Sequence, residues 1–321
     1  NLNMKIQVYA CHEGVQESLL REWVNRGHEV YLTEGVTKWS EERAAIAEGV
    51  KREWPSNPDV IWVGSPQDVG QALKYKWSKF KPGIPLVLTH WWIPSIKRFA
   101  GTVYKFAHQV SVCEWGREYL MDHWKMDSAV MYCPVNPDIF TLREEAPDPK
   151  RVICVGNHFP SRSIMGWEYL VQIMDKVYQK DPEVHFEFLG VNPEINPNDY
   201  PNVSTRSLPQ NEMPDYQAKA RCVVITTTFN LIPHSLLGAM ALGRNIVAFD
   251  LPSLHEVIEH GKSGFLIPQY DTDKFADQIL ELTNSPVDPE IGRKGRENVL
   301  AKCDYRLVAS QYEEFFANVI K

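Results

Sequence analysis

Short apolar runs alternate with amphipathic segments along almost the whole chain. Near-continuous apolar runs of the first half lie at 5–11, 29–33, 59–64, 85–90, 109–113 and 129–135, and those of the second half at 151–156, 185–190, 222–228 and 245–250. Strands of a parallel sheet have this character, because helices cover both faces of the sheet. The pattern therefore predicts an α/β fold built from doubly wound, Rossmann-like sheets.

A polar stretch, TLREEAPDPK at 141–150, interrupts the alternation and has the Pro and charge content of a linker. We expect a first Rossmann-like domain over 1–143, a second over 144–302, and a separate C-terminal segment over 303–321. Ligands of open α/β sheets bind at the carboxyl ends of the strands. Two such domains predict a cleft into which both sets of strand ends face.

Composition places the chain among globular proteins and excludes several classes. Of its 321 residues 44% are hydrophobic, and the formal net charge is −7. No apolar run approaches the ~20 residues that cross a bilayer. The six cysteines are scattered without a C-x-x-C pair, and most lie in apolar runs. We interpret them as reduced, buried thiols of a cytoplasmic protein, with peripheral attachment to a membrane left open.

One predicted helix has an unusual start. In NLIPHSLLGAMALG (230–243) a row of small and apolar residues predicts a buried helix that begins near Pro233, His234 and Ser235. Pro suits the first helical position, and the unpaired amides of a helix N-terminus attract anions such as phosphate. The alternative is a buried helix of purely structural purpose, with its first turn capped by Thr228 or Asn230.

The segment SLLGAMALGRNIVAFDLPSLHEVIEHGKSGFLIP (235–268) resembles the donor-binding segment of retaining, family-four-type glycosyltransferases with the GT-B fold. Matches to the family pattern occur at Ala239, Met240, Ala241, Gly243, Glu256, Gly261, Gly264 and Leu266. Further resemblances, in chain order, are VQESLLREWVNRGHEV, CPVNPDIF, RVICVGN and SLPQNEMPDYQAKARCVVITTT. The resemblance implies transfer of a sugar from a nucleotide-diphosphate sugar to a hydroxyl group, with a C-terminal helix that packs back on the first domain.

The resemblance also implies a set of donor-binding residues. These are Gly14, Asn157, Arg162, Leu208, Asn230, Pro233, His234, Ser235 and Glu256, and His90 corresponds to a family histidine that contacts the donor sugar. The chain departs from the family at the E-x7-E motif, whose two glutamates correspond to Asn230 and Gly238. It departs again at Asn157, where the family has an arginine. Arg162 is the cation near enough to grip a diphosphate in its place, so His90 and Arg162 are the catalytic candidates.

The implied reaction needs neither a metal nor a further cofactor. In the family the leaving phosphate itself helps to take the acceptor proton during front-face attack, and the chain has no D-x-D motif in a suggestive place. Its donor would be the nucleotide-diphosphate sugar, whose departing diphosphate is stabilised by amides and cations.

The first domain contains a basic, aromatic tract. Residues 69–113 hold seven Lys or Arg and no Asp or Glu. The acceptor-side candidates are His12, Lys74, Lys76, Trp77, Trp91, Trp92 and Arg98. Such a surface suits a polyanion, either DNA with hydroxylated bases or an anionic membrane. The alternative is a solvated helix face whose aromatic side is buried.

Two other functions remain open at this point. A non-catalytic GT-B protein that binds a nucleotide sugar or glycan fits the replacements at Asn157, Asn230 and Gly238. A nucleotide-sugar epimerase on the same fold would need a cluster of carboxylates, and the sequence indicates none.

Overall fold

In the computed structural model, residues 3–9, 16–32, 48–53, 55–64, 69–78, 83–91, 104–156, 159–190, 194–208 and 212–321 are described. The chain divides into two compact units. Unit 1 comprises 1–134 and 302–321, and unit 2 comprises 135–301. The candidates His12, Gly14, Trp92, Arg98 and Asn157 lie outside the described residues.

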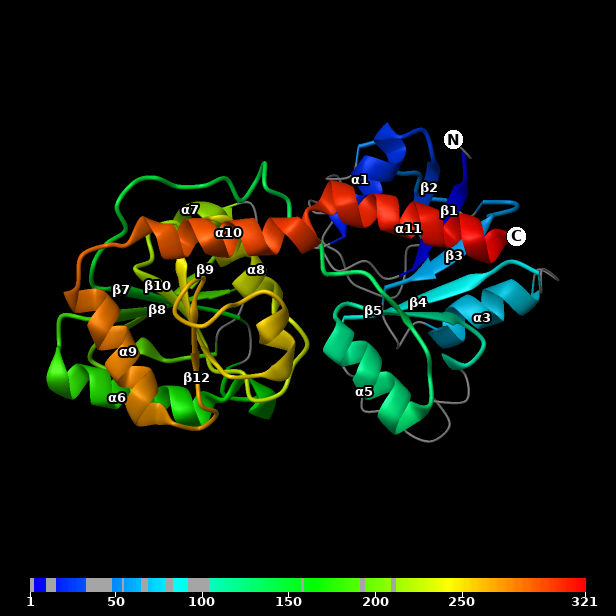
Figure 1. Cartoon of the computed structure of the whole chain (residues 1–321). Coiled ribbons are helices and arrows are strands. Elements are labelled where there is room, and N and C mark those ends of the chain that lie inside the picture. The colour runs from blue at the N-terminus through cyan, green and yellow to red at the C-terminus, as the bar shows by residue number, and fades with distance from the viewer. Residues whose placement is uncertain are drawn as a thin grey trace. The chain divides into compact units, whose positions relative to one another are not determined.

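Each unit contains one six-stranded parallel sheet with helices beside it (Figure 1). The strand order in unit 1 is β2-β1-β3-β4-β5-β6, with bounds β1 Lys5–Tyr9, β2 Glu29–Leu32, β3 Val60–Val63, β4 Leu86–His90, β5 His108–Ser111 and β6 Ala129–Val130. The order in unit 2 is β12-β11-β10-β7-β8-β9, with bounds β7 Arg151–Val155, β8 His185–Gly190, β9 Val203–Ser207, β10 Cys222–Ile225, β11 Asn245–Phe249 and β12 Phe265–Ile267. The predicted pair of doubly wound sheets is confirmed.

The helices follow the expected alternation. The described α-helices of unit 1 are α1 Glu17–Asn25, α3 Val69–Ser78, α5 Glu114–Trp124 and α11 Tyr305–Ile320. Those of unit 2 are α6 Trp167–Lys180, α7 Met213–Gln217, α8 His234–Ala241, α9 Thr272–Asn284 and α10 Pro289–Cys303, whose last two residues fall in unit 1. Short 3-10 turns are η2 Ser163–Met165, η3 Pro197–Asp199 and η5 Pro252–Glu256.

Aromatic residues pack α11 against the rest of unit 1. The rings of Trp23 and Trp62 meet edge-on at 5.2 Å, and Tyr312 of α11 lies 5.9 and 5.2 Å from them. The Trp23 indole donates to the Ala309 carbonyl at 3.2 Å. Fully buried aromatic rings contribute strongly to core stability, so the C-terminal helix is part of this core.

In unit 2 the sheet packs against α6 and α9, which lie side by side (Figure 1). Phe186, Phe188 and Phe249 project from the sheet into this core, and Phe275 of α9 meets them. The five described cysteines are buried and outside any disulfide, as predicted for Cys113, Cys133, Cys154 and Cys222. Burial raises the pKa of Cys222 to about 12, which keeps this thiol protonated and inert.

No helix in the described part of the chain has both the length and the apolar character required to cross a bilayer.

Candidate functional site

The carboxyl end of the unit 2 sheet is where the loops after β7 and β10 meet. The amide of Thr228 donates to the Ile164 carbonyl at 3.0 Å, and the Thr226 hydroxyl donates to the Met165 carbonyl at 2.9 Å. Gly166 closes the first loop with φ +69°, a backbone conformation that favours glycine. These contacts fix the loop that contains Arg162 beside the loop that leads into α8.

The loop before α8 is also held from its other side. The Ser253 hydroxyl, in η5 after β11, donates to the carbonyls of Asn230 and Leu231 at 3.1 Å each. The Gln269 amide, after β12, donates to the Thr228 carbonyl. Sequence reasoning missed both supports, because a single serine or glutamine in a loop carries no signal of its partner.

Helix α8 begins one residue later than predicted. Pro233 has ψ 133° and is the N-cap residue, so the first helical residue is His234. Pro233 makes no side-chain cap hydrogen bond, and the N-cap residue is neither Thr228 nor Asn230. The intrahelical bonds start with the amides of Leu236 and Leu237, both to the Pro233 carbonyl. The Ser235 amide thus lies in the first turn, where a helix N-terminus attracts negative charge.

The structure explains why glycine, at position 238, replaces the second glutamate of the E-x7-E motif. A Cβ atom on Gly238 would lie 2.7 Å from Cε1 of the Phe140 ring. Phe140 is buried and follows the segment CPVNPDI. The phenyl ring therefore occupies the space that a longer side chain at 238 would need.

The other described donor-side candidates are spread along the same end of the sheet. Arg162 is exposed and precedes η2, whereas Asn230 and Glu256 are half-buried near the start of α8 and in η5. Leu208 is buried after the edge strand β9, and its amide donates to the Gly190 carbonyl at 3.2 Å. The structure joins the loops of Arg162, Asn230 and Ser235 directly and leaves Leu208 farther along the sheet.

His90 ends β4 in unit 1 and is 1% exposed. Gln109 donates both amide hydrogens to the carbonyls of Tyr104 and Ala107, so its Oε1 accepts from His90 Nε2 at 2.7 Å. Nδ1 is then the unprotonated nitrogen, and it has no partner among the described residues. Burial lowers the pKa of His90 to about 4, although the Gln109 bond raises it. His90 is therefore a neutral hydrogen-bond acceptor at neutral pH.

The described part of the basic tract lies at two ends of the unit 1 sheet. Trp91 follows β4 beside His90 and contacts Trp62. Because α3 runs antiparallel to the strands, its last turn, with Lys76 and Trp77, lies at their amino end. There the Trp77 ring meets Phe106 edge-on at 6.0 Å, just before β5. The predicted single acceptor surface is thus divided, and Lys74, Lys76 and Trp77 are remote from the end of the sheet that His90 occupies.

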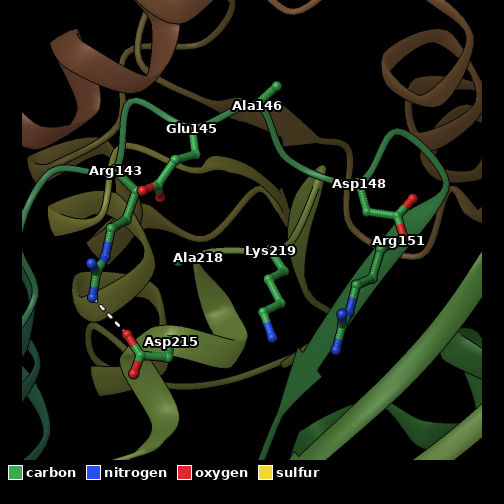
Figure 2. A pocket seen from close by; sticks show the side chains of 8 residues that line it. All are labelled: Arg143, Glu145, Ala146, Asp148, Arg151, Asp215, Ala218 and Lys219. Atoms are coloured by element: carbon green, nitrogen blue, oxygen red, sulfur yellow. Dashed lines mark hydrogen bonds and ion pairs between the residues drawn. The ribbon is translucent and has the colours of Figure 1, made fainter.

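A cavity of about 540 Å³ in unit 2 is not at the carboxyl end of the sheet. Figure 2 shows Arg143 paired with Asp215, and Lys219 and Arg151 directed into the same open space. Arg151 begins β7 and Lys219 precedes β10, so this cavity lies at the amino ends of the strands. We do not assign it to the donor.

Among the described residues, no group of three or more His, Cys, Asp or Glu side chains could hold a metal ion.

Part of the chain matches a known protein family. Residues 149–285 match the family model described as glycosyl transferases group 1. This match lies within unit 2 and, together with the two Rossmann-like sheets of the GT-B fold, confirms the resemblance to group 1 glycosyltransferases that was found in the sequence.

Two curated relatives are similar to parts of the chain. The poly(ribitol-phosphate) α-N-acetylglucosaminyltransferase of Staphylococcus aureus is 29% identical over 184 residues, which are 50% of this chain and 36% of that protein. The N-acetyl-α-D-glucosaminyl L-malate synthase of Bacillus anthracis is 32% identical over 87 residues, 27% of this chain and 23% of that protein. The matches thus span well under half the length of these relatives.

Solved structures share the fold over most or all of the chain. HepE of Anabaena in complex with UDP has a TM-score of 0.76 and 14% identity, and the match covers 98% of this chain and 100% of HepE. Sucrose-phosphate synthase of Thermosynechococcus elongatus has a TM-score of 0.75 and 14% identity, with 99% of each chain covered. A TarM variant of S. aureus has a TM-score of 0.68 and 19% identity, over 80% of this chain and 55% of TarM.

Proposed function

We propose that this protein transfers a sugar from a UDP-sugar to an acceptor hydroxyl with retention of configuration. The observation that carries the proposal is the start of α8 after the N-cap residue Pro233, held by two neighbouring loops in the segment that matches group 1 glycosyltransferases. UDP is bound in the structures of HepE and TarM that share the fold. Two relatives are named for transfer of an α-N-acetylglucosaminyl group, and UDP-N-acetylglucosamine is itself α-linked, which favours this donor and retention.

Each residue of the proposed site has a chemical role. The Ser235 amide and the α8 dipole stabilise the negative charge that develops on the leaving diphosphate, and Arg162 adds a bidentate cation from the exposed loop. His90 belongs to unit 1, where its Nδ1 is a buried hydrogen-bond acceptor. It is not the general base, because a nitrogen with a pKa of about 4 holds a proton poorly at neutral pH. With Gly238 under Phe140, the ribose is held by groups other than a carboxylate at that position.

Ser235→Asp tests the donor site. A carboxylate in the first turn of α8 repels the diphosphate, so we expect UDP affinity to fall at least 30-fold, about 2 kcal/mol. Calorimetric titration of the full chain with UDP measures this effect. Gln172→Glu adds the same charge on the exposed face of α6 and is the matched control, which should bind UDP like the unmodified protein.

Activity is measured by release of UDP from a panel of UDP-sugars with and without acceptors. Turnover of UDP-N-acetylglucosamine supports the proposed reaction. UDP binding that is lost in Ser235→Asp, but without turnover of any sugar, would instead support the non-catalytic binding protein. If UDP does not bind, or binds Ser235→Asp equally well, the donor site is refuted.

We further propose that the acceptor is a polymer that carries phosphate groups. The relative from S. aureus is named for transfer to poly(ribitol-phosphate). Trp77 and Phe106 are 55% and 59% exposed, and Lys74 and Lys105 are exposed beside them in sequence. Exposed aromatic rings among lysines fit a phosphate-rich chain with apolar stretches. A long polymer can contact this surface while a distant hydroxyl reacts, which a small acceptor cannot do.

Trp77→Ala combined with Phe106→Ala tests the polymer surface. We expect affinity for poly(ribitol-phosphate) to fall about tenfold, because two ring contacts are worth roughly 0.5–1 kcal/mol each at exposed sites. Tyr178→Ala removes an aromatic ring of 38% exposure from α6 and is the control. UDP affinity should not change in either variant. Equal polymer binding by the unmodified protein and the double variant would exclude this surface.

A further inference from the structure

A second cavity of unit 2, of about 290 Å³, is lined by several arginines. Arg221 directly precedes β10, and Arg244 directly precedes β11, so the cavity lies at the amino ends of these strands. The segment 142–147 and the beginning of α10 complete its wall. The proposed donor site is at the carboxyl end of the same sheet, so the two sites are distinct.

Arg221 is 2% exposed and binds the end of α9. Its Nε donates to the Leu282 carbonyl at 2.6 Å, and its Nη2 donates to the carbonyls of Ser285 and Pro286 at 3.2 and 3.0 Å. Nη1 is buried and has no partner among the described residues. A guanidinium has five N–H donors, so the contacts with α9 leave donor capacity on Arg221, which lines the cavity.

Arg244 is 6% exposed and is likewise bound only to carbonyl oxygens in the described part of the chain. Its two terminal nitrogens donate to the carbonyls of Arg143 and Glu145. Its Nε is buried and has no partner in the described ranges of the chain, and the same holds for Nε of Arg143. Burial lowers the pKa of Arg221 and of Arg244, which means that both charges are poorly compensated.

Carboxylates near the cavity do not neutralise the buried arginines. Asp215 is committed to Arg143 at 2.6 Å across the neighbouring cavity (Figure 2). Glu144, Glu145 and Asp288 also line the cavity, but all three are exposed, and solvent screens their charge. Glu145 raises the pKa of Arg244, yet burial has the larger effect. Arg293 of α10 adds a cation at the rim.

We propose that this cavity binds inorganic phosphate, with the unpartnered N–H groups of Arg143, Arg221 and Arg244 as donors. Charge-assisted bonds from guanidinium groups to an oxyanion are strong and directional, and they compensate the buried charge. Asn245 begins β11 and lines the same cavity, and its buried Oδ1 is an acceptor without a partner among the described residues. The P–O–H group of hydrogenphosphate can donate to this oxygen, whereas sulfate has no hydrogen to donate. The site therefore prefers phosphate to sulfate.

Phosphate titration of the full chain tests this site. The titration is followed by calorimetry at constant ionic strength, with chloride as the replaced anion and saturating UDP present to fill the donor site. We expect saturable binding that is weakened at least fivefold in Arg293→Ala and at least tenfold in Arg244→Gln. Sulfate should bind at least threefold more weakly than phosphate.

Lys294→Ala is the matched control. Lys294 neighbours Arg293 on α10, is also exposed and also forms a surface ion pair three residues away, but it does not line the cavity. Its phosphate affinity should stay within twofold of the unmodified protein. Binding that does not saturate, that is equal in Arg293→Ala and Lys294→Ala, or that disappears when UDP is added would overturn the proposal. If UDP itself fails to bind, the titration without UDP still separates Arg293→Ala from Lys294→Ala.

Discussion

Replacing Gly166 by alanine is expected to lower the free energy of unfolding of unit 2 by about 3 kcal/mol or more. The φ of +69° costs an L-residue about 1–2 kcal/mol. The new Cβ atom would also overlap the Thr226 carbonyl oxygen, which is rigid backbone. Relief of this overlap must separate the two loops and break the bonds from Thr226 to Met165 and from Thr228 to Ile164. UDP affinity should fall as well, because these loops form the proposed donor site.

Gly261→Ala separates the backbone cost from the steric cost. Gly261 has φ +75°, but no atom of the described residues lies within 4 Å of the position of its Cβ, so alanine there should cost only about 1–2 kcal/mol. Urea denaturation of both variants, followed by circular dichroism, measures the difference. If the free energy of unfolding falls equally in the two variants, the loop contact at Gly166 does not contribute to stability.

His90 is expected to make the protein acid-sensitive. Its folded-state pKa of about 4 is below the ordinary value of 6.5, so the unfolded chain binds the proton more readily between these values. The neutral ring is fully compatible with the fold above pH 6.5, and stability falls as the pH decreases from there towards 4. At pH 4.5 the loss from this one group is about 2.5 kcal/mol relative to pH 7.

The measurement is urea denaturation at pH 7 and at pH 4.5. In His90→Gln, which retains a hydrogen-bond donor towards Gln109 but cannot be protonated, the loss between the two pH values should be smaller by about 2.5 kcal/mol. His123→Gln is the control, since His123 is an exposed ring stacked on Tyr119. A pH dependence that is the same in His90→Gln as in the unmodified protein would contradict the assignment.

The fold could be predicted from the sequence because most strands of both sheets are continuous apolar runs. The prediction did not include β9 and β12, for different reasons. β9, VSTRS, is an edge strand whose side chains are largely solvated, so it shows no apolar run. β12 has only three residues, too few for a pattern. The apolar run 129–135 contains only two strand residues, since the chain turns into the P-V-N-P segment.

The candidate site could be predicted only in part. The start of α8 has a local signal, because a proline precedes a run of small apolar residues. The cover of Gly238 by Phe140 has none, since the two residues are far apart in the chain. The roles of Gln109 and Ser253 depend in the same way on distant partners. The basic tract was predicted as one surface because sequence proximity does not reveal that a helix carries its last turn to the other end of the sheet.

Because α11 belongs to unit 1, the two units are completed at different times during synthesis. Unit 2 is a continuous segment and can fold once residue 301 has left the ribosome. Unit 1 can complete its core only after α11 has been synthesised, because Tyr312 and Phe316 fill the space beside Trp23 and Trp62. A nascent chain that stops before α11 would expose two tryptophans and invite chaperone binding, although unit 2 was already native.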